Sequence, residues 1–192
     1  NYARRQMKID WLELWKGLWR GLISEHGKPL GVDNPISITR TLPSGYDREN
    51  EESVQRHAIV AFLKANVGDP YTFGAEIDVK ELNPSTGDCS EYMEQAYIRA
   101  GLAYPDGAAN QRNFCRGRAV MEPKLGDPFF LGPNTAGIPH TGAYVGDGMV
   151  VHAAGRPIGR VVMVSLAEIK SHPRFQGWFR HPEFLWEMNE RV

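Results

Sequence analysis

Apolar residues recur at helical spacing near the beginning of the chain. In residues 7–27, Trp11, Trp15 and Trp19 stand four positions apart, and this spacing places them on one face of a helix. The face either packs on the chain's own core or docks on a partner protein or a membrane surface. Acidic residues interleaved with the basic ones in this segment weaken the membrane version.

Two further helices follow from the pattern. Residues 31–46 hold prolines and glycines and predict a connector. Residues 48–65 combine an acidic start with an apolar stripe, which predicts a helix. A glycine-containing loop comes next, and another helix is expected to begin near Cys89 and to stop at Gly101.

The spacing of apolar residues changes in the last third of the chain, from a helical pattern to short apolar runs. The stretch "HTGAYVGDGMVVHAAG" holds two short apolar runs joined by "GDG", which is a hairpin signal. The stretches "RVVMVSL" and "FQGWFRH" predict two more strands. Helices followed by antiparallel strands predict an α+β fold, with the helices packed on a small antiparallel sheet of about five strands.

Composition narrows the possible functions. A length of 192 residues allows one substantial core and a short appended element. The net charge of −1 argues against nucleic-acid binding, and no apolar run reaches the roughly 18 residues of a transmembrane segment. The chain begins with Asn1, so the absence of a signal peptide carries little weight.

Cys89 is the first candidate for chemistry. A thiol in the first turn of a helix lies near unpaired N–H groups, which favour the nucleophilic thiolate, and Asp88 or Ser85 is suited to cap that helix. A lone helical cysteine is, however, more often a buried small apolar residue. The other cysteine, Cys115, carries no motif and is interpreted as a buried or semi-buried thiol, and a disulfide between the two would remove the nucleophile.

Two histidines are related by the predicted hairpin. If the chain turns at "GDG", His140 and His152 become cross-strand neighbours, and one imidazole can orient the other. Either one alone would be interpreted as a structural histidine, but the pair beside a helix-mounted cysteine predicts a nucleophile, a base and an orienting group. The same three residues are also a possible zinc site. No second thiol or carboxylate stands at ligand spacing, so we expect no metal and no cofactor.

These motifs together resemble the NlpC-type cell-wall cysteine peptidases, a papain-like family. The usual pattern is Gly-x-Pro-Tyr-x-Trp-Gly-Gly, Asp-Cys-Ser-Gly, His-Val-Gly-Ile-Tyr-x-Gly and a final His-Ala pair. The likeness covers roughly residues 53–180, and Gln111 and the segment "LGDPFF" also stand where the family has similar residues. The matching positions are Gly68, Pro70, Tyr71, Gly74, Asp88, Cys89, Ser90, His140, Gly142, Tyr144, Val145, Gly146, His152 and Ala153.

The resemblance implies a set of roles. Cys89 would be the nucleophile, His140 the base and His152 the group that orients His140. The Cys89 N–H and the Tyr71 hydroxyl would stabilise the oxyanion. Tyr71, Asp88 and Ser90 would hold a substrate amine, with Gln111 and Glu91 as further candidate binding residues. The implied substrates are bacterial peptidoglycan peptides, commonly cut between γ-D-glutamate and a diamino acid.

The sequence departs from the family pattern in two places. Glu91 replaces the glycine after Cys-Ser, and its charge is expected to raise the pKa of the neighbouring thiol and its bulk to narrow the cleft. Phe73 and Ala75 stand where tryptophan and glycine are usual.

The predicted organisation is an N-terminal helical extension with connector in residues 1–50 and a peptidase domain in residues 51–192. The protein is expected to act at the bacterial cell wall or in the periplasm, either secreted or delivered by a larger assembly such as a phage tail in a virion. The helix face with Trp11, Trp15 and Trp19 would then be the surface that docks on that assembly. The alternatives are an inactive structural or binding module of the same fold, and an acyltransferase or deamidase.

Overall fold

A computed structural model describes residues 48–81, 83–134, 137 and 139–184. The predicted docking helix at residues 7–27 and the connector therefore lie outside the described residues. The predicted boundary between residues 50 and 51 falls inside the first described helix. In chain order the elements are α2 (Arg48–Ala65), α3 (Cys89–Arg99), α4 (Ala108–Phe114), β1 (Ala119–Val120), β2 (Pro128–Leu131), β3 (His140–Gly146), β4 (Met149–Ala154), β5 (Arg160–Ser165), α5 (Leu166–Ser171), β6 (Phe175–Phe179) and η1 (Pro182–Phe184).

The described strands form one antiparallel sheet in the order β1-β6-β2-β3-β4-β5. The predicted α+β class is confirmed. The sheet has six strands rather than about five, because β1 is a two-residue strand paired with the end of β6. A strand this short leaves no alternation to detect in a sequence.

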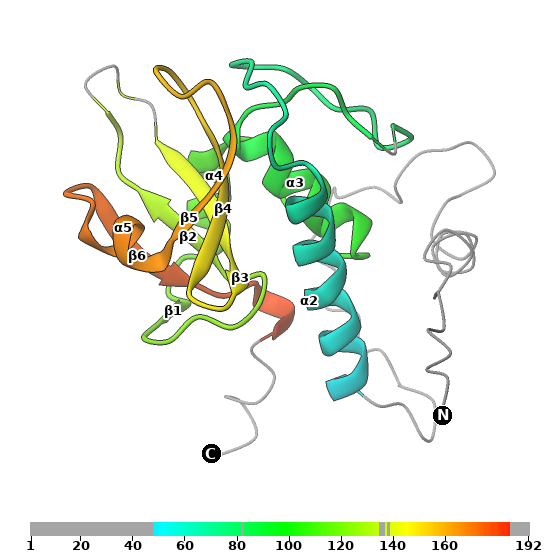
Figure 1. Cartoon of the computed structure of the whole chain (residues 1–192). Coiled ribbons are helices and arrows are strands. Elements are labelled where there is room, and N and C mark those ends of the chain that lie inside the picture. The colour runs from blue at the N-terminus through cyan, green and yellow to red at the C-terminus, as the bar shows by residue number, and fades with distance from the viewer. Residues whose placement is uncertain (1–47, 82, 135–136, 138, 185–192) are drawn as a thin grey trace, which may run out of the picture. The chain divides into compact units, whose positions relative to one another are not determined.

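Helices cover both faces of the sheet. Figure 1 shows α2 and α3 side by side against one face, with α5 on the other side of the strands. Neighbouring residues of a strand therefore enter different cores: Phe130 packs with residues of α2 and α3, whereas Phe129 packs with Ile169 of α5. All four residues of β2 are buried for this reason.

The hairpin between β3 and β4 is confirmed, and its turn lies at Asp147 and Gly148. Both residues have positive φ, 53° and 70°, as the tight turn of a hairpin requires. Helices α4 and α5 were not predicted, because seven and six residues are too few for a helical period to stand out. The start of α5 is capped by Ser165, whose hydroxyl accepts the Glu168 N–H at 3.1 Å.

A buried ion-pair network connects three distant segments. The Asp127 carboxylate, which is fully buried, accepts from Arg56 of α2 at 2.8 Å and from Arg180, just after β6, at 2.9 Å. It also accepts the Lys124 N–H at 2.9 Å. The Arg56 guanidinium lies 4.1 Å from the centre of the Phe184 ring, so η1 covers the network. The network holds the beginning of β2 between α2 and the end of β6.

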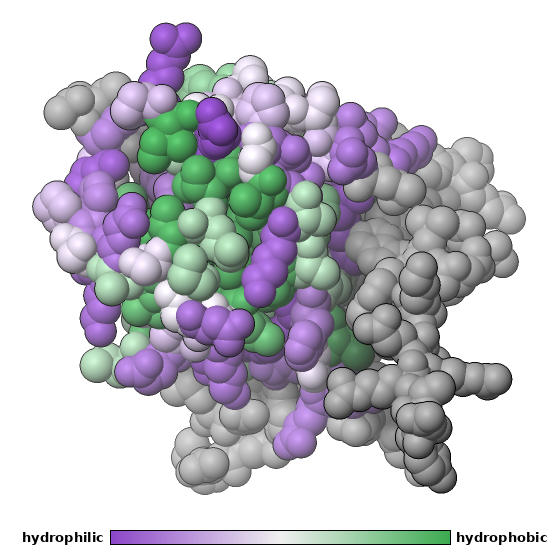
Figure 2. All heavy atoms as spheres, in the orientation of Figure 1, coloured by the Kyte–Doolittle hydropathy of each residue, from purple (hydrophilic) through white to green (hydrophobic). Residues whose placement is uncertain are grey.

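On the face drawn in Figure 2, hydrophilic residues surround a group of apolar residues near the middle. The exposed large apolar side chains are Val54, Val67, Phe73, Met121, Ile158 and Met163. Within the described segments, none of the helices has both the length and the apolar character that crossing a lipid bilayer demands.

Candidate active site

Cys89 is the first residue of α3, and Asp88 caps that helix. One oxygen of the Asp88 carboxylate accepts the N–H groups of Ser90 and Glu91 at 2.9 and 3.0 Å and the Ser90 hydroxyl at 2.8 Å. Its other oxygen accepts the Gly74 N–H at 3.1 Å. The cap predicted from the sequence is therefore present, and it also ties the preceding loop to the beginning of the helix.

The two histidines of the hairpin contact each other directly. His140 opens β3, and its Nε2 lies 2.8 Å from Nδ1 of His152 on β4. The rings are nearly perpendicular, at 82°, with centroids 4.9 Å apart. The Phe129 ring borders both imidazoles, with centroid distances of 6.3 and 6.0 Å. The predicted association of the pair is thus present in the structure.

The contact between the histidines depends on Gly142. A Cβ atom at Gly142 would lie 2.5 Å from Cβ of His152 and 2.7 Å from the Phe129 ring, so only glycine fits there. His152 thus lies across from Gly142 and reaches His140 diagonally over the vacant side-chain position. The two histidines are therefore cross-strand neighbours, as the sequence predicted, and they meet diagonally rather than directly opposite each other.

The Cys89 thiol is buried, at 6% exposure, beside the start of β3. Burial raises its pKa to about 12, the Asp88 charge adds to the increase, and the backbone N–H groups of Thr141, Ser90 and Cys89 oppose it. The sequence-based expectation of a thiolate favoured by the helix N-terminus is therefore wrong for the resting protein. Desolvation outweighs the local N–H groups.

Both imidazoles are neutral at neutral pH. Burial lowers the pKa of His140 to about 3, and the charges of His152, Arg174 and His172 add to the decrease. Burial likewise lowers the pKa of His152 to about 4, with a further contribution from His172. At rest, the Cys89 thiol and the two imidazoles are therefore all neutral.

Glu91 does not act on the thiol as predicted. Residues i and i+2 of an α-helix are separated by about 200°, so Glu91 lies on the side of α3 away from Cys89. Its Oε1 accepts the Ile77 N–H at 2.9 Å and the Gln95 side-chain amide at 3.1 Å, and the residue is 2% exposed. The charge that raises the Cys89 pKa comes from Asp88.

The remaining predicted residues lie around the same helix start. Tyr71 is half-buried, and burial together with the charges of Cys89 and Asp88 raises its pKa to about 12. Ser90 is buried and donates to Asp88. Gln111 of α4 is fully buried and donates to the backbone oxygens of Ser90 and Pro105 at 2.8 and 2.9 Å. Gln111 thus connects α4 to the backbone of the first turn of α3.

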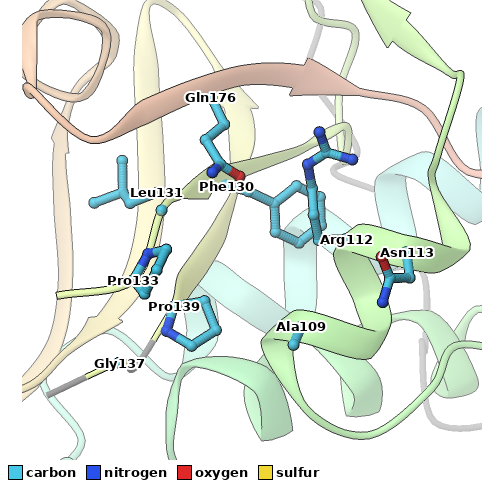
Figure 3. Close-up of a pocket in the computed structure, with 10 residues that line it drawn as sticks. Ala109, Arg112, Asn113, Phe130, Leu131, Pro133, Gly137, Pro139 and Gln176 are labelled. Atoms are coloured by element: carbon cyan, nitrogen blue, oxygen red, sulfur yellow. The ribbon is translucent and has the colours of Figure 1, made fainter.

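A cavity of about 270 Å³ lies next to the start of β3. Figure 3 shows Leu131 of β2, Pro133 and Pro139 on one side, and the Phe130 side chain with Ala109 and Arg112 of α4 on the other. Pro139 directly precedes His140. The sequence offered no signal for this cavity, since its lining comes from elements far apart in the chain.

The buried, neutral thiol leads to a testable expectation for alkylation. Because the thiolate fraction of a group with a pKa near 12 grows throughout the accessible range, alkylation of Cys89 by iodoacetamide should accelerate about tenfold for each pH unit from about pH 6 to 9. Cys115, whose pKa is raised to about 11 by burial, should show the same slope. Mass spectrometry of the labelled peptides measures both rates. If the alkylation rate of Cys89 stopped rising near neutral pH, that result would contradict a neutral thiol and a neutral imidazole in the resting protein.

Comparisons with known proteins converge on one family. A family model described as NlpC/P60 matches residues 68–177. The chain is 30% identical over 95 residues to the probable endopeptidase p60 of Listeria monocytogenes, covering 50% of this chain and 18% of that protein. It is 29% identical over 122 residues to a probable endopeptidase of Mycobacterium tuberculosis, covering 62% of this chain and 29% of that protein. The chain thus spans less than a third of the length of these two relatives.

Solved structures show the same fold. The peptidoglycan hydrolase RipB of Mycobacterium tuberculosis aligns with a TM-score of 0.57 at 24% identity, covering 88% of this chain and 79% of that one. The P60 domain of an antigen from Mycobacterium avium subspecies paratuberculosis aligns with a TM-score of 0.55 at 21% identity, covering 69% and 96% of the two chains.

Proposed function

We propose that this chain, which belongs to the NlpC/P60 family, is a cysteine peptidase that hydrolyses peptides of bacterial peptidoglycan. The observation that carries the proposal is the 2.8 Å contact between His140 Nε2 and His152 Nδ1, on the strand whose Thr141 N–H is directed at the Cys89 sulfur. A nucleophile, a base and an orienting group are the three parts that a cysteine peptidase needs.

The proposed first step is a proton transfer coupled to attack. His140 Nε2 is engaged with His152, so Nδ1 of His140 is the nitrogen that accepts the thiol proton. The sulfur then forms a bond to the substrate carbonyl carbon, and the carbonyl oxygen becomes an oxyanion. Because thiol and imidazole are both neutral at rest, proton transfer accompanies the attack rather than preceding it. His152 accepts the Nε2–H of His140 and stabilises the imidazolium.

Two donors are proposed for the oxyanion. The Cys89 backbone N–H is at the first turn of α3, where N–H groups have no intrahelical acceptor. The Tyr71 hydroxyl is the second donor, and its pKa, raised to about 12, keeps it protonated. Collapse of the intermediate passes the proton from His140 to the leaving amine and leaves a thioester on Cys89. Water activated by His140 then releases the acid and restores the thiol.

The scissile bond that we propose joins γ-D-glutamate to a diamino acid, as the family resemblance implies. The charge of Asp88, with Tyr71 and Ser90 beside it, suits a substrate ammonium group. Asp88 Oδ1 already accepts three hydrogen bonds, so Oδ2, which accepts one, is the oxygen for that contact. We further propose that the protein acts at the cell wall or in the periplasm, either secreted or delivered by an assembly such as a phage tail.

A second candidate function is a catalytically weak or inactive binding module of the same fold. The thiol that is 6% exposed and has a high pKa favours it. Acyl transfer or deamidation by the same thioester chemistry is the third candidate. These alternatives predict different products from the same experiment.

The test is mass spectrometry of defined peptidoglycan fragments after incubation with the full chain. Hydrolysis predicts a product that gains one water and splits at the γ-D-glutamyl bond. Cys115→Ala is the matched control, because it removes the other buried thiol and should leave the product unchanged. Cys89→Ala should form none. Fragments that are bound without any change in mass support the binding module, and a transferred acyl group supports acyl transfer.

A further inference from the structure

The cavity beside the start of β3 combines an apolar wall with polar side chains from two different elements. Phe130 and Leu131 of β2 are buried in its wall, and its volume of about 270 Å³ is close to the lower end of the range for small-molecule sites, roughly 300 Å³. Figure 3 shows the Arg112 side chain rising from α4 and the Gln176 side chain descending from β6. The cavity is therefore lined by one cationic and one amide side chain.

Arg112 is the positive charge of this cavity. Its guanidinium lies 4.2 Å from the centre of the Phe179 ring, which offers the charge no acceptor oxygen. Its Nε is buried and has no hydrogen-bond partner among residues 48–81, 83–134, 137 and 139–184. Within the same part of the chain no carboxylate forms an ion pair with it. A half-buried arginine without an acceptor favours a bound anion, and its planar fork of donors matches a carboxylate.

Gln176 supplies an uncharged donor to the same cavity. Its amide lies over Gly132, because a Cβ atom at Gly132 would come 3.0 Å from Gln176 Nε2. The Gly132 N–H donates to the Arg174 backbone oxygen at 2.7 Å, which holds the end of β2 beside β6. The Gln176 amide itself makes no hydrogen bond with the described residues. Its N–H groups are therefore available to a ligand oxygen.

The cavity and the proposed amine-binding residues lie on opposite sides of β3. The Tyr71 N–H donates to the Gly159 oxygen at 2.9 Å, just before β5, which ends the sheet on one side. The cavity is lined from β2 and β6, which follow β3 in the other direction. Pro139 of the cavity directly precedes His140, the group proposed to protonate the leaving amine. A peptide that crosses β3 with its ammonium group at Asp88 therefore has its leaving residue at the cavity.

We propose that this cavity is the subsite for the leaving residue of the substrate, and that Arg112 and Gln176 bind a free carboxylate on that residue. The inference rests on the peptidase function proposed above and adds a substrate class. The substrate has an ammonium group on the acyl side of the scissile bond and a carboxylate on the leaving side. A diamino acid that ends the peptide has such a carboxylate. A leaving residue whose carboxylate is amidated, or extended by a further peptide bond, loses the ion pair with Arg112.

Two synthetic tripeptides test the subsite. One is L-alanyl-γ-D-glutamyl-L-lysine with a free C-terminal carboxylate, and the other is the same tripeptide as its C-terminal carboxamide. They differ only in the charge that the cavity would bind. Calorimetric titration of the full Cys89→Ala chain measures their binding without cleavage. We expect the free acid to bind at least about tenfold more tightly than the carboxamide.

Variants of Arg112 in the same Cys89→Ala chain assign the effect. Arg112→Gln should weaken binding of the free acid at least about tenfold and bring the two tripeptides within about twofold of each other. Arg112→Lys should recover part of the preference, because the charge remains while the planar fork is lost. Arg116→Gln is the matched control, since it removes the same charge from an exposed position four residues later and should leave the preference unchanged. Circular dichroism shows whether each variant is folded.

The comparison of the two tripeptides needs no variant of Arg112, so it stands even if Arg112→Gln does not fold. Equal binding of both tripeptides overturns the subsite, and so does the absence of acid binding up to about 10 mM. An unchanged preference in folded Arg112→Gln also overturns it. Cleavage by the chain with Cys89 intact tests the peptidase separately. Equal kcat/KM for both tripeptides contradicts the subsite and supports the peptidase, whereas selective binding without cleavage supports the carboxylate site and contradicts hydrolysis.

Discussion

Replacing His140 by alanine is expected to lower kcat/KM on a cleaved peptidoglycan fragment by at least about 1,000-fold. The Cys89 thiol, with a pKa near 12, supplies almost no thiolate at neutral pH, so the reaction depends on a base at the moment of attack. His140 is the imidazole next to Thr141, whose N–H is directed at the sulfur. Without it the leaving amine also loses its proton donor. Steady-state assays with purified variants measure the effect.

The other histidines provide the controls. His152→Ala should cause a smaller loss, and His152→Asn should recover part of it, since an amide can still bond to His140 Nε2. This recovery separates a positioning role from a structural one. His57→Ala, on the exposed side of α2, should leave kcat/KM unchanged. If His140→Ala keeps more than about a tenth of the activity, the proposed base is wrong.

Replacing Asp127 by asparagine is expected to lower the free energy of unfolding by about 3–5 kcal/mol. The change keeps the shape of the side chain but removes the negative charge between Arg56 and Arg180, which are both largely buried. Arg180 then loses the carboxylate that it faces, and Arg56 keeps only its 2.6 Å ion pair with Glu52 in place of two carboxylate partners. This loss is a large fraction of the roughly 5–15 kcal/mol that stabilises a typical domain. Urea unfolding followed by tryptophan fluorescence measures it.

Asp147→Asn is the matched control for Asp127→Asn, because it removes the same charge from an exposed turn. Asp147 is exposed and has a φ of 53°, a conformation that asparagine adopts readily, so its unfolding free energy should change by less than about 0.5 kcal/mol. Arg180→Lys should cost less than Asp127→Asn, because the charge remains while the second hydrogen bond to Asp127 is lost. A cost below about 1 kcal/mol for Asp127→Asn would show that the network does not hold β2 in place.

Local sequence was enough to locate the helices and the hairpin that bring the chemistry together. The apolar stripe of α2, the cap before Cys89 and the "GDG" turn depend on neighbours within a few residues, and each of these elements is present. The same local reasoning missed α4 and α5, which are one or two turns long. Helix α4 packs on α3, and α5 packs on the sheet. Short elements of this kind carry too few residues to show a period.

Packing between distant segments explains where the predictions from local sequence were wrong. From the sequence, Cys89 is a helix-start thiol with a lowered pKa. In the fold it is desolvated against β3, and the pKa rises instead. Glu91 is two residues from Cys89 in the chain but lies on the other side of the helix, beside Glu76 and Asp106. The position of a residue in a helix sets the direction of its side chain. The loops that pack against the helix determine which residues that side chain contacts.

The sequence by itself determined which residues are available and in what order: a capped cysteine, two histidines flanking a tight turn, and the motif spacing of the NlpC/P60 family. Only the tertiary structure decided how they meet. His152 reaches His140 diagonally because Gly142 leaves its position empty, and Asp127 holds together segments that are 53 or more residues apart. Spacing along a chain specifies local geometry, but contact, desolvation and charge compensation arise only when distant segments pack.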